Sequence, residues 1–255
     1  MMRIKIHPLY AHMANAIEGI VHDKYKYDKV YCNKRNFVAK LTIDGKEFVV
    51  KRFKKPHLLN RFIYTFIRET KACRAYENAL MLLERDIKTP LPVAYMEIKQ
   101  NGLFHTGYLL TEYMSHPTLE NLMLKDIESY SPELEKLEED LMRFTIDVND
   151  KRVLPKDYNG GNIFYIYDKD SGHYDFALTD VNRVLFNVKP SKKTIIRLFE
   201  QMGVQLKNLY RFMSKLASIQ GDCTREYMYE FLRIRTKKRH RKSFFSKIAH
   251  PFKKR

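Results

Sequence analysis

Alternating apolar and polar residues predict an antiparallel sheet in the N-terminal part of the chain. Period-two runs occur at 29–32, 37–43 and 47–53, and again at 93–98 and 105–111. Such alternation is typical of strands that bury one face. Asp44-Gly45 and Asn101-Gly102 lie between successive runs, and both dipeptides favour the two-residue turn of a β-hairpin. Residues 1–27 are basic and Tyr-rich without a clear pattern, and we assign them no function.

Two helical patterns lie between the third and fourth predicted strands. The first covers 58–67, with apolar residues at Leu58, Leu59, Phe62, Ile63, Phe66 and Ile67. We expect this face to be part of the core, because most amphipathic helices bury their apolar stripe. Contact with a lipid surface is the alternative. The second pattern runs from about Thr70 to Arg85, with apolar residues at Ala72, Ala75, Tyr76, Ala79, Leu80 and Leu83.

The rest of the chain is predicted to be mostly helical. Ser131, followed by Pro132 and Glu133, is a favourable start for one of these helices. Helices are expected at 117–124 and 132–149 and, after a β-hairpin at 162–179, at 191–201, 206–216 and from Thr224 onward. Strands followed by helices predict an α+β fold with two lobes. We expect an N-lobe at 1–113, a C-lobe at 114–235 and a basic tail at 236–255.

The stretch from Val153 to Val181 carries the clearest candidate chemistry. Asp157 and Asn162 have the D-x-x-x-x-N spacing of a kinase catalytic loop, in which Asp157 would accept the proton of an attacking hydroxyl. The predicted hairpin ends on Asp180, and we expect its two ends to bring Asn162 and Asp180 to one Mg²⁺ site. By itself the short motif also fits a surface loop. Residues elsewhere in the chain must therefore distinguish a catalytic loop from a surface loop.

Residues of the expected N-lobe complete a candidate ATP site. Lys51, in the third strand, takes the place of the lysine that pairs with nucleotide phosphates. Glu77 on the following helix is the candidate partner of Lys51, with Glu69 in reserve. Backbone groups near Glu112 and Met114 would meet the adenine edge, as in a kinase hinge. Taken singly, each of these residues also fits an ordinary solvent-facing or buried position.

The order and rough spacing of six of these residues resemble the protein kinase-like fold. They are Lys51, Glu77, Glu112, Asp157, Asn162 and Asp180. In detail, the chain resembles the bacterial lipopolysaccharide core kinases of the Kdo and heptose type, in the segments 71–80, 87–92, 156–162 and 179–183. The resemblance covers roughly residues 29–235. Six ordered positions are far more specific than any one motif.

The resemblance implies a phosphotransferase that uses ATP and Mg²⁺. Its acceptor would be a sugar hydroxyl of the lipopolysaccharide inner core, on a precursor glycolipid at the cytoplasmic face of the inner membrane. This chain departs from the kinase pattern in three places. Residues 33–36 replace a glycine-rich loop, Pro155 stands where a histidine is expected, and Val181-Asn182 follows Asp180 in place of the D-F-G sequence.

These departures leave two alternatives to an active sugar kinase. Pro155 favours a non-catalytic pseudokinase that binds a partner, and the same constellation also serves an atypical Ser/Thr protein kinase. Because the candidate base and both candidate metal ligands are present, we expect an active enzyme.

The apolar runs and the cysteines of the sequence predict where the protein is located. The chain of 255 residues has no apolar run long enough to span a bilayer and no signal-peptide pattern, so we expect it in the cytoplasm. Its three cysteines, Cys32, Cys73 and Cys223, are far apart, which argues for reduced thiols.

The C-terminal end carries most of the formal charge of +17, with eleven Lys or Arg and no Asp or Glu between Phe231 and Arg255. Aromatic and basic residues interleave there, as in helices that bind membrane surfaces. We therefore expect peripheral contact of the tail with the anionic inner membrane. Nucleic-acid binding is the runner-up, and a simple solvated charge run is the third interpretation.

Overall fold

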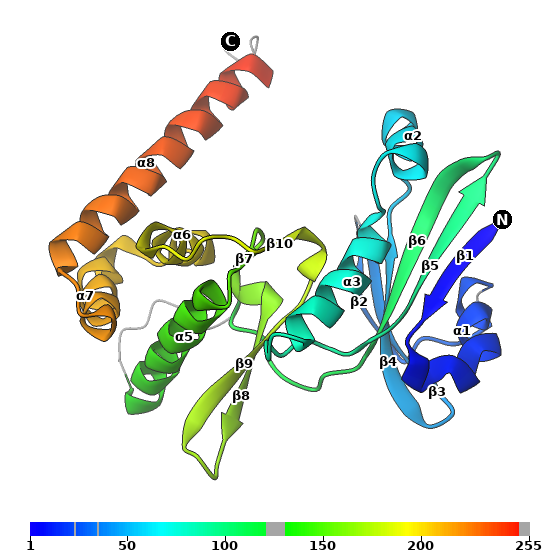
Figure 1. The fold of residues 1–255 in the computed structure, drawn as a ribbon, viewed down its shortest axis with the longest axis horizontal. Coiled ribbons are helices and arrows are strands. Elements are labelled where there is room, and N and C mark those ends of the chain that lie inside the picture. The colour runs from blue at the N-terminus through cyan, green and yellow to red at the C-terminus, as the bar shows by residue number, and fades with distance from the viewer. Residues whose placement is uncertain (23, 35, 121–130, 250–255) are drawn as a thin grey trace. The chain divides into compact units, whose positions relative to one another are not determined.

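The structure is a computed structural model that describes residues 1–22, 24–34, 36–120 and 131–249 (Figure 1), and of residues 207 and 241–249 it describes the backbone only. The chain divides into two compact units. Unit 1 consists of Met1–His116 and Ala177–Val184, and unit 2 consists of Pro117–Phe176 and Leu185–Arg255. The first boundary thus follows His116, and the short segment that contains Asp180 joins the N-terminal unit.

The described strands of unit 1 form a six-stranded antiparallel sheet in the order β1-β5-β6-β4-β3-β2. Their bounds are β1 Met2–Ile6, β2 Lys29–Asn33, β3 Phe37–Ile43, β4 Lys46–Phe53, β5 Pro92–Gln100 and β6 Leu103–Glu112. The five predicted strands are confirmed, and β1 is an additional edge strand that pairs with β5. Asp44-Gly45 and Asn101-Gly102 have φ between 49° and 78°, the left-handed values that these turns require.

Helices cover both faces of this sheet. Helix α3 (Lys71–Leu83) begins at Thr70, whose hydroxyl accepts a hydrogen bond from the Cys73 N–H at 3.1 Å. It packs on one face against a cluster that includes Tyr95 and Leu109. The 3₁₀-helix η1 (Pro8–Met13) and α1 (Ala14–Val21) pack on the other face, against a cluster that includes Val50. Because side chains alternate along a strand, Lys51 projects from the same face as α3.

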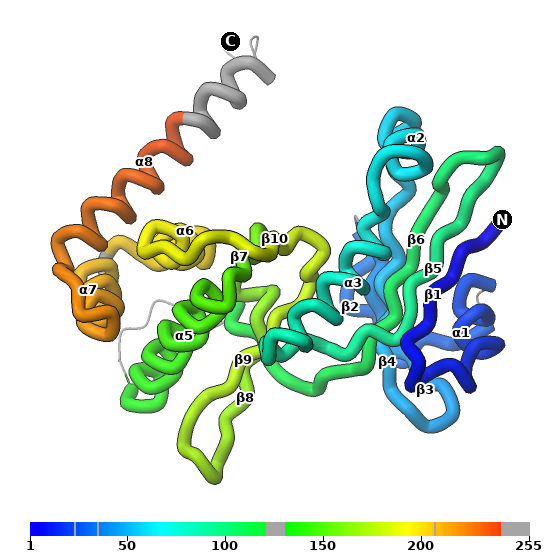
Figure 2. The backbone as a smooth tube through the Cα atoms, viewed as in Figure 1, coloured from blue at the N-terminus to red at the C-terminus, as the bar shows by residue number. Residues whose placement is uncertain are grey.

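Helix α2 (Leu58–Phe66) follows β4 and precedes α3 in the chain (Figure 2). Every residue of α2 is described, and none of them is buried. The expectation that this apolar stripe belongs to the core is therefore wrong. The hydrophobic pattern identified the apolar side of the helix correctly, but the sheet contacts the helix on another side.

Unit 2 contains the predicted hairpin and the C-terminal helices. Its elements are α5 Pro132–Asp150, β7 Val153–Pro155, the 3₁₀-helix η2 Gly160–Asn162, β8 Ile163–Asp168, β9 His173–Leu178, β10 Val184–Phe186, α6 Lys192–Met202, η4 Leu206–Asn208, α7 Leu209–Gln220 and α8 Thr224–Ala249. The segment 177–184, which belongs to unit 1, includes the last two residues of β9 and the first residue of β10. The hairpin β8–β9 and the helices α5 to α8 are confirmed.

Parts of two predicted segments lie outside the described residues. Residues 121–130, which contain most of the expected helix at 117–124, are not described, and neither are residues 250–255 of the tail. Helix α8 continues through residue 235 to Ala249 without a break at the expected start of the tail. No helix in the described part of the chain is sufficiently long and apolar to cross a bilayer.

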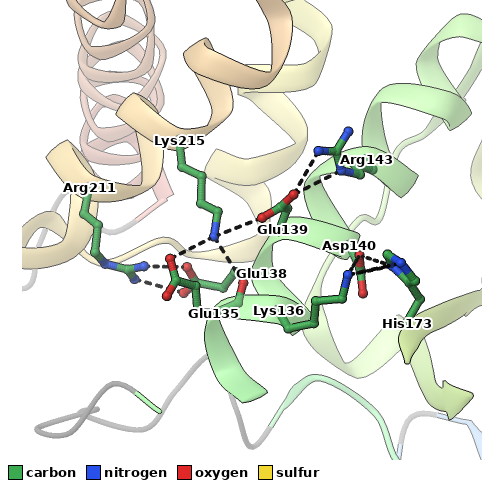
Figure 3. Close-up of polar contacts among 9 residues, drawn as sticks. All are labelled: Glu135, Lys136, Glu138, Glu139, Asp140, Arg143, His173, Arg211 and Lys215. Carbon is green, nitrogen blue, oxygen red and sulfur yellow. Dashed lines mark hydrogen bonds and ion pairs between the residues drawn. The ribbon is translucent and has the colours of Figure 1, made fainter. Parts of the chain in front are cut away.

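Polar contacts fix α5 within unit 2 (Figure 3). Glu138 is buried and accepts two hydrogen bonds from the Arg211 guanidinium of α7, at 2.8 and 3.0 Å. Asp140, also buried, accepts the Tyr174 N–H at 2.8 Å and contacts His173 at 3.0 Å, at the start of β9. Helix α5 is thereby tied to α7 and to the hairpin, and its C-terminal end leads into the loop that carries Asp157.

Candidate functional site

Lys51 and Asp180 form the centre of the candidate site in unit 1. The Lys51 Nζ lies 2.6 Å from Oδ1 of Asp180, and the Asn182 side-chain amide donates to the same oxygen at 2.6 Å. Asp180 precedes the 3₁₀-helix η3 (Val181–Arg183) and has a φ of 54°, a left-handed value that Asp tolerates better than most residues. Lys51, the candidate contact to phosphate, and Asp180, the candidate metal ligand, thus form an ion pair with each other.

Helix α3 holds the turn that contains Asp180. The side-chain amide of Asn78, on α3, donates to the Val181 carbonyl at 2.8 Å. On the other side of the turn, the Leu178 N–H donates to the Lys88 carbonyl at 2.9 Å. The two hydrogen bonds fix the backbone before and after Asp180, so that its carboxylate is held towards β4. The contact of Asn78 joins distant segments and leaves no local signal in the sequence. Asn182 lies only two residues after Asp180, and that short spacing was the signal that could have identified it.

Glu77 has a different partner from the expected one. It accepts a hydrogen bond from Lys5 Nζ at 2.6 Å, and the Lys5 ammonium also lies 5.4 Å from the centre of the Tyr76 ring. The expected Lys51–Glu77 ion pair is therefore a wrong prediction for this structure. The physical reason is β1, the edge strand beside β5, which brings Lys5 to this side of α3. The alternating sequence of Met2–Ile6 was the signal that could have identified this strand. Glu69, the reserve candidate, is exposed.

The segment that contains Glu112 and Met114 lies at the end of β6. The Glu112 N–H donates to the Leu91 carbonyl at 3.0 Å, so it is already engaged. Its carboxylate accepts hydrogen bonds from the Tyr10 hydroxyl and, at 2.7 Å, from Lys46. Burial by itself would raise the pKa of Glu112, but the hydrogen bonds from Lys46 and Tyr10 hold that pKa below its usual value. The Glu112 side chain thus ties η1 to the sheet. That backbone groups near Glu112 and Met114 meet adenine stays a prediction.

Asp157 and Asn162 form the candidate catalytic loop in unit 2. The Asn162 side-chain amide donates to the backbone carbonyl of Asp157 at 2.9 Å, and the Asn159 N–H donates to the same carbonyl at 3.1 Å. The Asn159 side-chain oxygen accepts the Gly161 N–H at 3.1 Å. The spacing of four residues between Asp and Asn therefore closes the loop on itself. The amide oxygen of Asn162 takes no part in this closure and is the atom suited to a cation.

Contacts with the helices α5 and α6 fix this loop. Tyr158 is fully buried, and its hydroxyl shares a hydrogen bond of 2.8 Å with Thr145 of α5. Its backbone N–H donates to the Gln201 side chain of α6 at 3.3 Å. A Cβ at Gly160 would lie 3.1 Å from the backbone of Glu120, so glycine permits the close approach of two chain segments there. The loop is thus fixed by a buried ring and by close backbone contact.

The donor atoms of the site suit a hard cation carried by phosphates. No group of three or more His, Cys, Asp or Glu that could hold a metal ion occurs in the described residues. Mg²⁺ bound through nucleotide phosphates needs only one or two protein oxygen ligands. The Asp180 carboxylate in unit 1 and the Asn162 amide oxygen in unit 2 are donors of this kind. That both face one ion stays a prediction.

Comparison with known proteins gives a result at the level of structure. No protein-family model matches the chain, and no curated protein matches it in sequence. The solved structure described as WaaP in complex with acyl carrier protein is similar to this chain, with a TM-score of 0.62 and 16% sequence identity. The similarity covers 94% of this chain and 98% of that chain. At this identity the likeness shows the fold, and the chain therefore has the α+β, protein kinase-like fold that it shares with WaaP.

Proposed function

We propose that the chain is a kinase that transfers the γ-phosphoryl group of ATP to a sugar hydroxyl, Kdo or heptose, of the lipopolysaccharide inner core. The observation that carries this proposal is the contact between Lys51 and Asp180 within a fold shared with WaaP. From the sequence, Lys51 is the predicted contact to the nucleotide phosphates and Asp180 a predicted Mg²⁺ ligand, and the two residues come from distant segments. The class of acceptor is proposed from the resemblance of the segments 71–80, 87–92, 156–162 and 179–183 to the lipopolysaccharide core kinases.

The roles proposed for the residues follow from their chemistry. Asp157 would orient the acceptor hydroxyl and take its proton, while a bond forms between the hydroxyl oxygen and the γ-phosphorus and the bond from that phosphorus to the β–γ bridging oxygen breaks. Lys51 would contact the phosphates with its ammonium group. Asn162 and Asp180 would hold Mg²⁺, which when bound neutralises phosphate charge. Asn162 has the further task of holding the Asp157 backbone.

The proposal can be tested by following labelled γ-phosphate from Mg-ATP. The purified chain is offered lipopolysaccharide precursors that carry Kdo alone or Kdo and heptose and, in parallel, a protein rich in exposed Ser and Thr. We expect label in a glycolipid. Label in the protein alone would favour the atypical protein kinase. ATP binding without transfer to any acceptor would favour the pseudokinase, for which the buried Pro155 of β7 is the specific argument.

We further propose that the chain acts at the cytoplasmic face of the inner membrane and that the basic tail contributes to attachment. The support is the excess of Lys and Arg after Phe231. Deletion of residues 236–255 should weaken the salt-sensitive part of binding to vesicles with anionic lipid, because that part reflects charge. Salt-sensitive binding of unchanged strength after the deletion would contradict this role of the tail.

A further inference from the structure

Helix α2 contacts the sheet through its polar side. The Arg61 guanidinium donates to the carbonyl groups of Phe104 and Gln100, at 2.8 and 3.2 Å. The Thr65 hydroxyl accepts the Phe104 N–H at 2.8 Å, and the Tyr64 ring packs against the Phe104 ring. These contacts hold the helix beside the start of β6. The orientation is the reverse of that in most globular proteins, where the polar side of a surface helix faces water.

The apolar side of α2 consequently faces outward. The exposed fractions are 68% for Leu58, 72% for Leu59, 49% for Phe62, 65% for Phe66 and 71% for Ile67. The rings of Phe62 and Phe66 contact each other, with centres 4.8 Å apart. A contiguous group of large apolar side chains on a surface marks a place where something binds.

The charge around α2 indicates what binds there. The segment from Lys54 to Arg68 contains four Lys or Arg and no Asp or Glu. Of these, Lys54, Lys55 and Arg68 are exposed at the two ends of the helix. Apolar residues on one side, with basic residues beside them, are the composition of helices that lie in the interface of an anionic bilayer.

We propose that α2 is a membrane-docking helix, whose outward side inserts into the interfacial region of a bilayer with anionic phospholipid. The lysines at its start and Arg68 at its end would then meet the lipid headgroups. The inference rests on the orientation and charge of α2 rather than on phosphoryl transfer. It adds to the proposed membrane location a second element, distinct from the basic tail.

The chain contains no Trp, so a single substitution creates a fluorescent reporter. In Phe66→Trp the reporter sits on the outward side of α2. In Leu9→Trp it sits on η1, also in unit 1, at a residue that is 66% exposed against 65% for Phe66. Vesicles with phosphatidylglycerol should shift the emission of Phe66→Trp to shorter wavelength and leave that of Leu9→Trp unchanged. Phosphatidylcholine vesicles should have a much smaller effect.

Two results would overturn the proposal. One is co-sedimentation of the protein with anionic vesicles while the Phe66→Trp emission does not shift. The other is a shift that grows with protein concentration in the absence of vesicles, since a second copy of the chain would then cover the helix.

A partition measurement at high salt gives a second test, because salt screens the contribution of the tail. The double variant Leu59→Ser/Phe66→Ser should bind anionic vesicles at least about tenfold more weakly than the wild type, since two apolar side chains no longer enter the interface. The control Leu9→Ser/Leu206→Ser also removes two exposed apolar side chains, but from η1 and η4. Equal binding of both double variants would refute the docking role. Transfer to a soluble, delipidated acceptor should not change in either variant, which separates a failure of this inference from a failure of the proposed kinase.

Discussion

In unit 1, Lys51 and Asp180 are held by each other, whereas in unit 2 Asp157 and Asn162 are held by the backbone. The first contact joins two charged side chains at 2.6 Å. The second joins a side-chain amide to a backbone carbonyl at 2.9 Å, within a loop that a buried tyrosine anchors. An ion pair can exchange partners when phosphate and metal arrive, but a loop closed on its own backbone keeps its shape. The difference fits the proposed roles, in which the first pair binds phosphate and metal and the second keeps the base and one metal ligand in a fixed loop.

Asp157→Asn should have the largest effect in this comparison. The variant keeps the shape of the loop, since the backbone carbonyl at position 157 still accepts the Asn162 amide, but it removes the proposed base. We expect phosphoryl transfer to fall by about two to four orders of magnitude. ATP affinity, measured by calorimetry, should not change. Asp170→Asn, in the exposed turn between β8 and β9, serves as the control and should behave as the wild type. Full transfer in Asp157→Asn would exclude the proposed base.

Lys51→Met should act on binding as well as on turnover. Methionine keeps an apolar stem on β4 and removes the charge that would meet the phosphates. We expect kcat/KM for ATP to fall by about 10²- to 10³-fold, with weaker ATP binding. Lys40→Met is the matched control, because Lys40 is a similarly covered lysine on β3 that pairs with Glu47. Equal losses in the two variants would indicate that Lys51 stabilises the sheet, as Lys40 does, and has no specific role at the site.

Asn162→Asp separates the two roles of Asn162. The variant keeps an oxygen ligand for a cation and loses the donor to the Asp157 carbonyl. We expect Mg²⁺-dependent ATP binding to persist and transfer to fall about tenfold, the effect of one lost hydrogen bond. Asn162→Ala removes both functions and should also weaken the metal-dependent part of ATP binding. Identical behaviour of the two variants would show that loop closure has no separate role.

Glu77→Gln should have the smallest effect. Because Glu77 pairs with Lys5 at a partly exposed position, we expect transfer to change by less than about fivefold. Lys5→Met should have an equally small effect. If Glu77 instead positions Lys51 during the reaction, Glu77→Gln would reduce kcat/KM as strongly as Lys51→Met does, and steady-state kinetics distinguish the two results.

Local signals made much of the fold predictable. The turns at Asp44-Gly45 and Asn101-Gly102 and the cap at Ser131 depend on residues next to each other in the chain, and the structure confirms all three. Strand β1 was missed because Met2–Ile6 is short and precedes the clearer meander. Its position beside β5 is a tertiary fact that no local pattern contains.

The candidate site was predictable in its residue types and only partly in its contacts. The D-x-x-x-x-N spacing singled out Asp157 and Asn162, and the contact between the Asn162 amide and the Asp157 carbonyl is local. The partners of Glu77 and Lys51 depend on where β1 and η3 lie, so the ion pairs could not be assigned. Helix α2 shows the same limit, since periodicity defines an apolar side but does not determine what covers it.

The most direct test of the central claim compares wild type with Asp180→Ala in the transfer of labelled γ-phosphate from Mg-ATP to lipopolysaccharide precursors. Asp180 is at once the proposed metal ligand and the partner of Lys51. We expect label in a core sugar with the wild type and none above background with the variant. Equal incorporation by both proteins would contradict the assigned site, and an inactive wild type that binds Mg-ATP would contradict the assigned acceptor or the activity itself.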